Sequence, residues 1–167
     1  MKIKIKEIAV LGMIAAVMCI TDLLMEALPN IHILAPLIVA STVIYRWKAV
    51  LAIYAYVFLI GFIQGIGVWW IPYLYVWTVL WAAVMLLPKN MPQKVKTIVY
   101  IAVASLHGFL FGTLYAPAQA LLFGFDFKQT LMWIAAGIPF DIIHGVSNFV
   151  CGMLIIPIIK VLKRVDR

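Results

Sequence analysis

The feature that most constrains this fold is a succession of long apolar runs with very little charge inside them. The 167-residue chain is 66% hydrophobic and only 11% charged. A water-soluble domain usually carries about 25% charged residues, so these charges are too few to cover a soluble surface. We therefore expect one compact domain, residues 1–167, that meets the lipid bilayer on most sides.

Six of these runs approach the roughly 20 apolar residues that a membrane-spanning helix needs. They are Ile8–Leu28, Ile33–Tyr45, Ala49–Gly67, Trp70–Leu87, Thr97–Phe123 and Leu131–Leu162. The last two contain Pro117 and Pro139, and they are long enough to kink at proline or to include a short helix outside the hydrocarbon core. The expected fold is an all-α membrane protein with six transmembrane helices.

The basic residues fall into alternate loops of this arrangement. They precede the first run, lie between the second and third and between the fourth and fifth, and follow the sixth, whereas Lys128 alone lies on the other side. Because cytoplasmic loops are enriched in Lys and Arg, we expect a multi-pass protein of the cell membrane with both termini cytoplasmic. A nucleic-acid partner is not expected, since the charge is spread over many loops instead of forming one basic face.

Polar side chains within the expected membrane helices are candidates for function, because burying them in lipid is costly. Asp141, His144 and Asn148 are three and then four residues apart, which places them on one helical face. This face either lines a polar pocket in the outer half of the membrane or forms a network that only fixes packing. Tyr115 and Gln119, four residues apart near the outer end of the fifth run, can point together.

An aromatic stripe begins at the outer end of the fourth run. Its members recur at helical steps of three and four residues: Trp70, Tyr73, Trp77 and Trp81. Trp81 lies about 16 Å along the helix from Trp70, too deep for an interfacial belt, so the stripe indicates helix packing or a stacking wall for a flat ligand. We expect Trp69, Trp70 and Tyr73 near a ligand, Trp77 as a further candidate and Trp81 in packing.

The first run carries two further patterns. Ala9, Gly12 and Ala16 form a small-residue stripe, which favours the close approach of another helix. Asp22 and Glu26, four residues apart at the outer end, form a solvated acidic face, a contact to a polar or cationic ligand, or an anchor of the helix end.

The remaining histidines and the absent motifs limit the chemistry. His32 is expected to be an exposed loop residue, and His107 is expected in helix packing. The sequence contains no Walker A, HExxH, GxSxG or CxxC motif, which are the short signatures of common ATPase, metalloprotease, hydrolase and redox sites. We therefore expect no catalytic residue, no metal site and no cofactor on this chain.

The whole chain resembles the S component, the substrate-binding membrane subunit, of energy-coupling factor (ECF) vitamin transporters. The resemblance rests on the six-run architecture and on three segments: "AVLGMIAAV", the Trp-rich external loop, and "GIPFDIIHGVSNFVCGMLIIP". It implies that a water-soluble vitamin or related micronutrient binds from outside, between the outer halves of the fourth to sixth helices. It also implies docking, through the first helices, onto a membrane T subunit driven by two ABC-type ATPases, which would use the ATP.

The substrate and two other classes of function stay open at this level. Many aromatics and few basic residues near the expected pocket favour thiamine, a pyridoxine-like compound or the larger cobalamin. A stand-alone proton- or ion-coupled carrier is one alternative. The other is an intramembrane enzyme that uses Asp141, His144 and His107 around a metal or as acid and base.

Overall fold

The computed structural model describes residues 4–28 and 30–166, and every regular element in that part of the chain is helical. The helices are α1 (Ile5–Met25), α2 (Leu34–Tyr45), η1 (Arg46–Lys48), α3 (Ala49–Gln64), α4 (Tyr73–Leu86), α5 (Gln93–Phe109), α6 (Phe111–Phe123), α7 (Phe127–Cys151), η2 (Gly152–Leu154) and α8 (Ile155–Val165). The expected all-α fold is thus confirmed.

Four helical stretches have the length and apolar composition to cross a membrane. They are Ile5–Met25, Leu34–Gln64, Gln93–Phe123 and Phe127–Val165, and α4 is a shorter apolar helix. Large apolar side chains cover much of the outside, among them Phe62 at 74% and Leu121 at 86% exposure. Such a surface suits lipid and not water, so the structure indicates a membrane-embedded protein.

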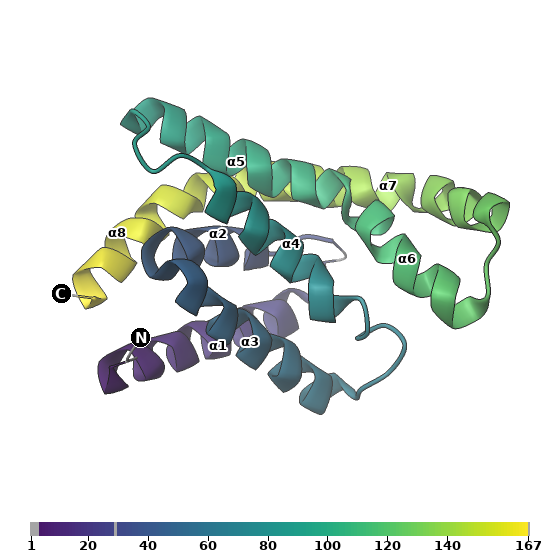
Figure 1. Cartoon of the computed structure of the whole chain (residues 1–167), viewed down its shortest axis with the longest axis horizontal. Coiled ribbons are helices and arrows are strands. Elements are labelled where there is room, and N and C mark those ends of the chain that lie inside the picture. Colours follow the sequence, from purple (N-terminus) through teal and green to yellow (C-terminus); the bar gives the residue numbers. More distant parts are fainter. Residues whose placement is uncertain (1–3, 29, 167) are drawn as a thin grey trace.

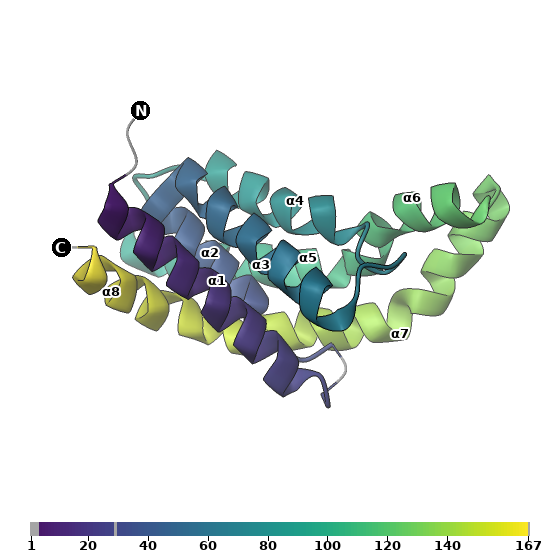
Figure 2. The same cartoon turned by 90° about the horizontal axis from the view of Figure 1, so that it is seen from below.

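The helices form an elongated bundle with a projecting end. Helix α5 runs antiparallel to α7 along its length, α2 packs against α8 and α4, and α1 packs against α3 (Figure 1). Helix α6 and the first half of α7 extend beyond the other helices, while the start of α1 and the end of α8 lie at the opposite end (Figure 2).

Two of the long stretches change direction at identifiable residues. The stretch Leu34–Gln64 turns at Arg46, whose φ of 54° lies in the left-handed region, and its guanidinium donates to the Met85 carbonyl at 3.0 Å. The fifth run breaks at Leu110, between α5 and α6, whereas Pro117 lies inside α6. This break leaves the backbone N–H of Gly112 free to donate to a side chain, and it donates to Asp141 Oδ1 at 2.9 Å.

The start of α7 illustrates how local sequence sets a boundary. Asp126 accepts a hydrogen bond from the Gln129 backbone at 2.7 Å, and the Gln129 side chain accepts one from the Asp126 backbone at 2.9 Å. This reciprocal pair is a capping box, which satisfies backbone N–H groups that the first turn leaves free. It starts the helix at Phe127, ahead of the apolar run that was expected to begin at Leu131.

Helices α5 and α7 approach closely through small residues. A Cβ atom added at Gly108 would lie 2.9 Å from the Gly145 Cα, so neither helix could approach as closely with a larger residue there. Ser105 Oγ also donates to the Gly145 carbonyl at 2.8 Å. This contact fixes α7 and therefore the polar residues that it carries.

Candidate functional site

Two neighbouring hollows lie between the α1–α2 connection and helices α4, α6 and α7. The smaller has a volume of about 160 Å³, and its polar lining includes Asp22, Glu26, His32 and His144. The larger, of about 280 Å³, is lined by residues that include Tyr115, Trp133 and Asp141. Asn30, Tyr73 and Phe111 line both hollows, so we treat the two as one candidate site.

A cluster of aromatic and histidine rings lies at this site, where His32, Phe111 and His144 form the inner wall and Trp77 and His107 pack behind them. Trp77, only 1% exposed, lies with its ring centroid 6.0 Å from His32, 5.6 Å from His107 and 5.5 Å from Phe111. His144 lies 4.6 Å from His32 and 4.7 Å from Phe111. The cluster brings together residues from α4, α5, α6, α7 and the α1–α2 connection.

Several polar atoms of this cluster are buried without a hydrogen-bond partner among the described residues. They are both ring nitrogens of His144, Nδ1 of His32 and His107, and Nε1 of Trp77. Burial, followed by the proximity of His107, lowers the pKa of His32 to about 4, so this ring is neutral at pH 7. A neutral imidazole can donate from one nitrogen and accept at the other. The inner wall can therefore offer directional polar contacts to a ligand.

The larger hollow has an aromatic side and an acidic side. Tyr115 stacks on Trp133 with centroids 6.2 Å apart, and its hydroxyl donates to the Trp69 carbonyl. Tyr73 meets Tyr115 edge to face at 6.5 Å. Asp141 also lines this hollow while it holds the start of α6 through Gly112.

The charges around the site have one sign. Asp22, Glu26 and Asp141 line it, and no Lys or Arg of the described residues does. Asp22 also accepts a hydrogen bond from the Tyr56 hydroxyl at 2.9 Å. Acidic and neutral groups favour a neutral or cationic ligand over a strongly anionic one.

The structure gathers some of the predicted site residues and separates others. Tyr73, Tyr115, Asp141 and His144 line the hollows, and Trp77 lies directly behind them, 5.6 Å from Tyr73.

Trp70 lies outside this group. It precedes the start of α4, donates from Nε1 to the Val57 carbonyl at 2.7 Å, and packs over Gly61 of α3. Trp70 therefore contacts α3, whereas its helical spacing had predicted a position near the ligand. Trp69 is half-buried beside Tyr73, 5.5 Å away, and borders the site without lining it.

Asn148 and Gln119 also lie away from the hollows. Asn148 is fully buried and donates to the Ala104 carbonyl of α5 at 3.1 Å, which favours the packing interpretation. Gln119 is 8% exposed on α6 and lines neither hollow. Trp81 donates to the Arg46 carbonyl at 3.1 Å, which agrees with its expected packing role.

Several residues of the candidate site were predicted in different surroundings or were not predicted from the sequence. His32 was expected to be exposed, yet it is half-buried within the ring cluster, and His107 belongs to the same cluster. Phe111 and Trp133 were not predicted at all. Phe111 lies four residues before Tyr115, and Trp133 lies eight residues before Asp141. Residues at these intervals lie on the same face of a helix, so their spacing from Tyr115 and Asp141 could have indicated them.

The small-residue stripe of α1 faces largely outward. Ala9 and Gly12 are exposed and Ala16 is half-buried, and a Cβ added at Gly12 would meet no heavy atom within 4 Å. The exposed part of the stripe is therefore open to lipid or to another helix.

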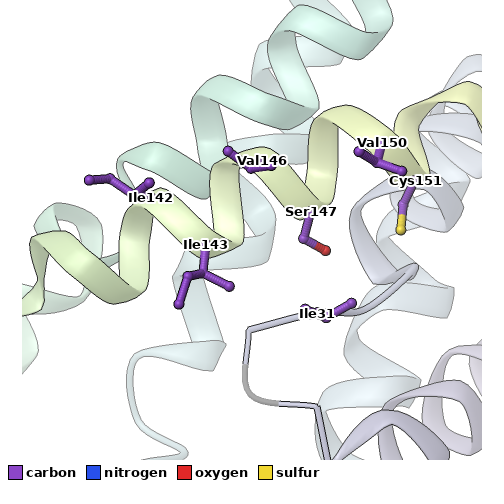
Figure 3. A pocket seen from close by; sticks show the side chains of 7 residues that line it. All are labelled: Ile31, Ile142, Ile143, Val146, Ser147, Val150 and Cys151. Atoms are coloured by element: carbon purple, nitrogen blue, oxygen red, sulfur yellow. The ribbon is translucent and has the colours of Figure 1, made fainter.

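A separate apolar hollow of about 400 Å³ lies between the α1–α2 connection and α7. Figure 3 shows Ile31 of that connection facing Ser147 of α7, with Ile143 and Val150 along the same helix. Its lining is almost entirely aliphatic, so it offers little to orient a polar ligand.

Among the described residues, no group of three or more His, Cys, Asp or Glu side chains has the arrangement to hold a metal ion. Comparison of the chain with models of protein families, with curated proteins and with solved structures gives no match.

Proposed function

We propose that this protein is the substrate-binding S component of an ECF-type transporter and takes up a water-soluble vitamin or related micronutrient. In this proposal the chain crosses the cell membrane six times, as α1, α2, α3, α4, α5–α6 and α7–α8, with both termini in the cytoplasm. The observation that supports it most is the hollow lined by Tyr73, Phe111 and His144, which lies between the end of α1, the starts of α4 and α6, and the middle of α7.

The chemistry of this site suits a small heterocyclic ligand. Tyr73, Phe111 and Tyr115 offer aromatic surfaces for stacking in the larger hollow. His144 offers two ring nitrogens without protein partners, and Asp141 or Asp22 can accept from an amino group or balance a positive charge. Sites of this kind combine apolar walls with a few oriented polar groups.

Volume distinguishes the candidate vitamins. Pockets for small molecules usually have volumes of roughly 300 Å³ and above. Taken as one site, the two hollows of about 160 Å³ and about 280 Å³ lie toward the lower end of the usual range. We therefore favour thiamine or a pyridoxine-like compound over cobalamin. The acidic lining favours thiamine in particular, because thiamine carries a positive charge.

The outward stripe of α1 supplies the surface for a partner. In the proposal Ala9, Gly12 and Ala16 dock onto a membrane T subunit, and two ABC-type ATPases supply the energy. Small side chains leave the backbone accessible to close helix packing, and the space beside Gly12 is open. The chain would bind its substrate alone but would accumulate it only with these partners.

The direct test is a titration of the purified chain with a vitamin panel, followed by tryptophan fluorescence. We expect one vitamin to change the emission with saturable binding. Tyr73→Ala and His144→Leu should each weaken binding at least tenfold, because each removes a lining group. Trp81→Phe is the matched control, since Trp81 donates to the Arg46 carbonyl, lines neither hollow and should leave affinity unchanged.

Two outcomes would count against the proposal. One is folded protein that responds to no vitamin or vitamin precursor. The other is uptake into vesicles that contain this chain alone and that follows a proton or ion gradient, because this result identifies a stand-alone carrier.

A further inference from the structure

A second candidate site lies at the end of the bundle where α5 begins and α8 ends. Two hollows of about 360 Å³ and about 300 Å³ lie side by side there, between α2, α5, α8 and the α4–α5 connection. They share Val43, Lys96, Tyr100 and Lys163, so these residues stand between the two hollows and contribute to both.

The rim of this double hollow is strongly basic. Five cationic side chains from four parts of the chain line it: Arg46, Lys89, Lys96, Lys160 and Lys163. No Asp or Glu of the described residues lines either hollow, and the salt bridge found in the described chain joins Lys48 to Glu7 instead. The lining itself therefore does not neutralise this positive charge.

The floor of the double hollow has a different character. Val43, Ile156 and Ile159 give it an aliphatic surface. Tyr100 is only 6% exposed and lines both hollows together with Lys96 and Lys163. A phenolic hydroxyl is a hydrogen-bond donor, so Tyr100 can donate to an anion that the two lysines hold.

A hollow lined by both aliphatic and cationic side chains is complementary to an anionic phospholipid. The fatty-acyl chains would lie on the aliphatic residues, and the phosphate would accept from Lys96, Lys163 and Tyr100. Basic pockets between membrane helices bind such headgroups, and each Lys or Arg near the surface strengthens the attraction. Free inorganic phosphate shares the headgroup chemistry but makes no use of the apolar floor.

We propose that this double hollow is a binding site for one anionic phospholipid of the adjacent leaflet. The site is separate from the vitamin site and depends only on membrane insertion, so it stands or fails independently of the transport proposal. Because the site lies between α2, α5 and α8, a bound lipid would contact all three helices.

The test compares lipid binding by the full-length chain in neutral detergent, using native mass spectrometry with dioctanoyl phosphatidylglycerol and dioctanoyl phosphatidylcholine as probes. We expect the wild-type chain to retain one phosphatidylglycerol in preference to phosphatidylcholine. The double variant Lys96→Gln/Lys163→Gln should bind it about thirtyfold more weakly, at about 1 kcal/mol for each lysine. Tyr100→Phe, which removes only the hydroxyl, should weaken binding a fewfold.

The matched control is Lys94→Gln/Arg164→Gln, which removes two positive charges from the same helices at residues that line neither hollow. It should retain wild-type lipid binding. Equal loss in both double variants would overturn the proposal, because it would indicate diffuse attraction to the basic surface. Equal retention of the two lipids would overturn it as well.

Two further outcomes address other occupants. Complete displacement of the lipid by millimolar inorganic phosphate would identify an anion site and overturn the lipid assignment. Absence of phosphatidylglycerol binding in the wild-type chain would also overturn it and would direct attention to an acidic segment of a partner protein. Circular dichroism of every variant and the vitamin titration above establish that folding and the first site are intact.

Discussion

Replacement of Asp141 by alanine tests whether this carboxyl group holds the break between α5 and α6. The side chain is 8% exposed, and its Oδ1 accepts from the Gly112 backbone at 2.9 Å. Hydrogen bonds to a charged group contribute about 1.5–3 kcal/mol. Alanine would leave the buried Gly112 N–H without this acceptor, which costs about 1–3 kcal/mol, and relief of the carboxyl group's desolvation would offset part of this loss.

We therefore expect Asp141→Ala to lower the free energy of unfolding by about 2 kcal/mol, a fall in Tm of about 4–8 °C for a chain of this size. Thermal unfolding followed by circular dichroism in detergent measures this change. Asp141→Asn keeps an oxygen that can accept from Gly112 and should lose less than half as much. If Asn weakens vitamin binding while it preserves stability, the charge of Asp141 serves the ligand and its oxygen serves the fold.

A double-mutant cycle sharpens this prediction. A Cβ added at Gly112 would lie 2.6 Å from Asp141 Oδ2, so Gly112→Ala must displace the carboxylate and should destabilise the protein. In the double variant with Asp141→Ala the methyl group has room. The double variant should therefore lose less free energy of unfolding than the two single variants lose in total. Additivity within about 0.5 kcal/mol, or an unchanged Tm for Asp141→Ala, would refute the proposed role of this contact.

Three other predictions follow from the site and the α1 surface. Gly12→Leu should leave Tm unchanged, because nothing lies within 4 Å of the added Cβ, yet it should reduce co-purification with a T subunit. Trp133→Phe should remove a large part of the ligand-dependent fluorescence change, because Trp133 lines the larger hollow, whereas Trp70→Phe should retain it, since Trp70 packs on α3; equal loss in both would contradict the assignment. The folded-state pKa of His32, about 4, lies below its ordinary value of 6.5, so unfolding should become easier as pH falls through this range. His32→Gln should remove at most about 3 kcal/mol of this pH-dependent loss in the free energy of unfolding and so flatten the pH dependence of Tm; an unchanged slope would contradict the burial of this ring.

Apolar content predicted the helical class and most helix positions, because lipid requires long runs of apolar residues with an internally bonded backbone. The expected third element begins at Ala49 as predicted, and the expected fifth ends at Phe123. The break at Leu110 could not be predicted in the same way. There Asp141, which is distant in sequence, supplies the acceptor for a backbone group that the break leaves free.

Helical spacing anticipated which polar residues of α7 share a face, and their role in binding stays a prediction. Asp141 and His144 lie on one face of α7, and both line the hollows. The same reasoning failed for Trp70, because α4 begins at Tyr73 and the preceding turn directs the indole toward Gly61 of α3. His32 was missed because a loop has no periodicity from which burial can be inferred.

The shortness of α2 relates the site to the thickness of the membrane. This helix has 12 residues. At the usual helical rise it is about 18 Å long, whereas the hydrocarbon core of a bilayer is about 30 Å thick. If its end at Tyr45 lies near one surface, the other end, next to His32, lies well below the opposite headgroups. A thicker bilayer would place the ring cluster farther from water, and a thinner one would bring it closer. Lipid chain length would then alter how readily a polar ligand reaches its site, without any change in the residues that bind it.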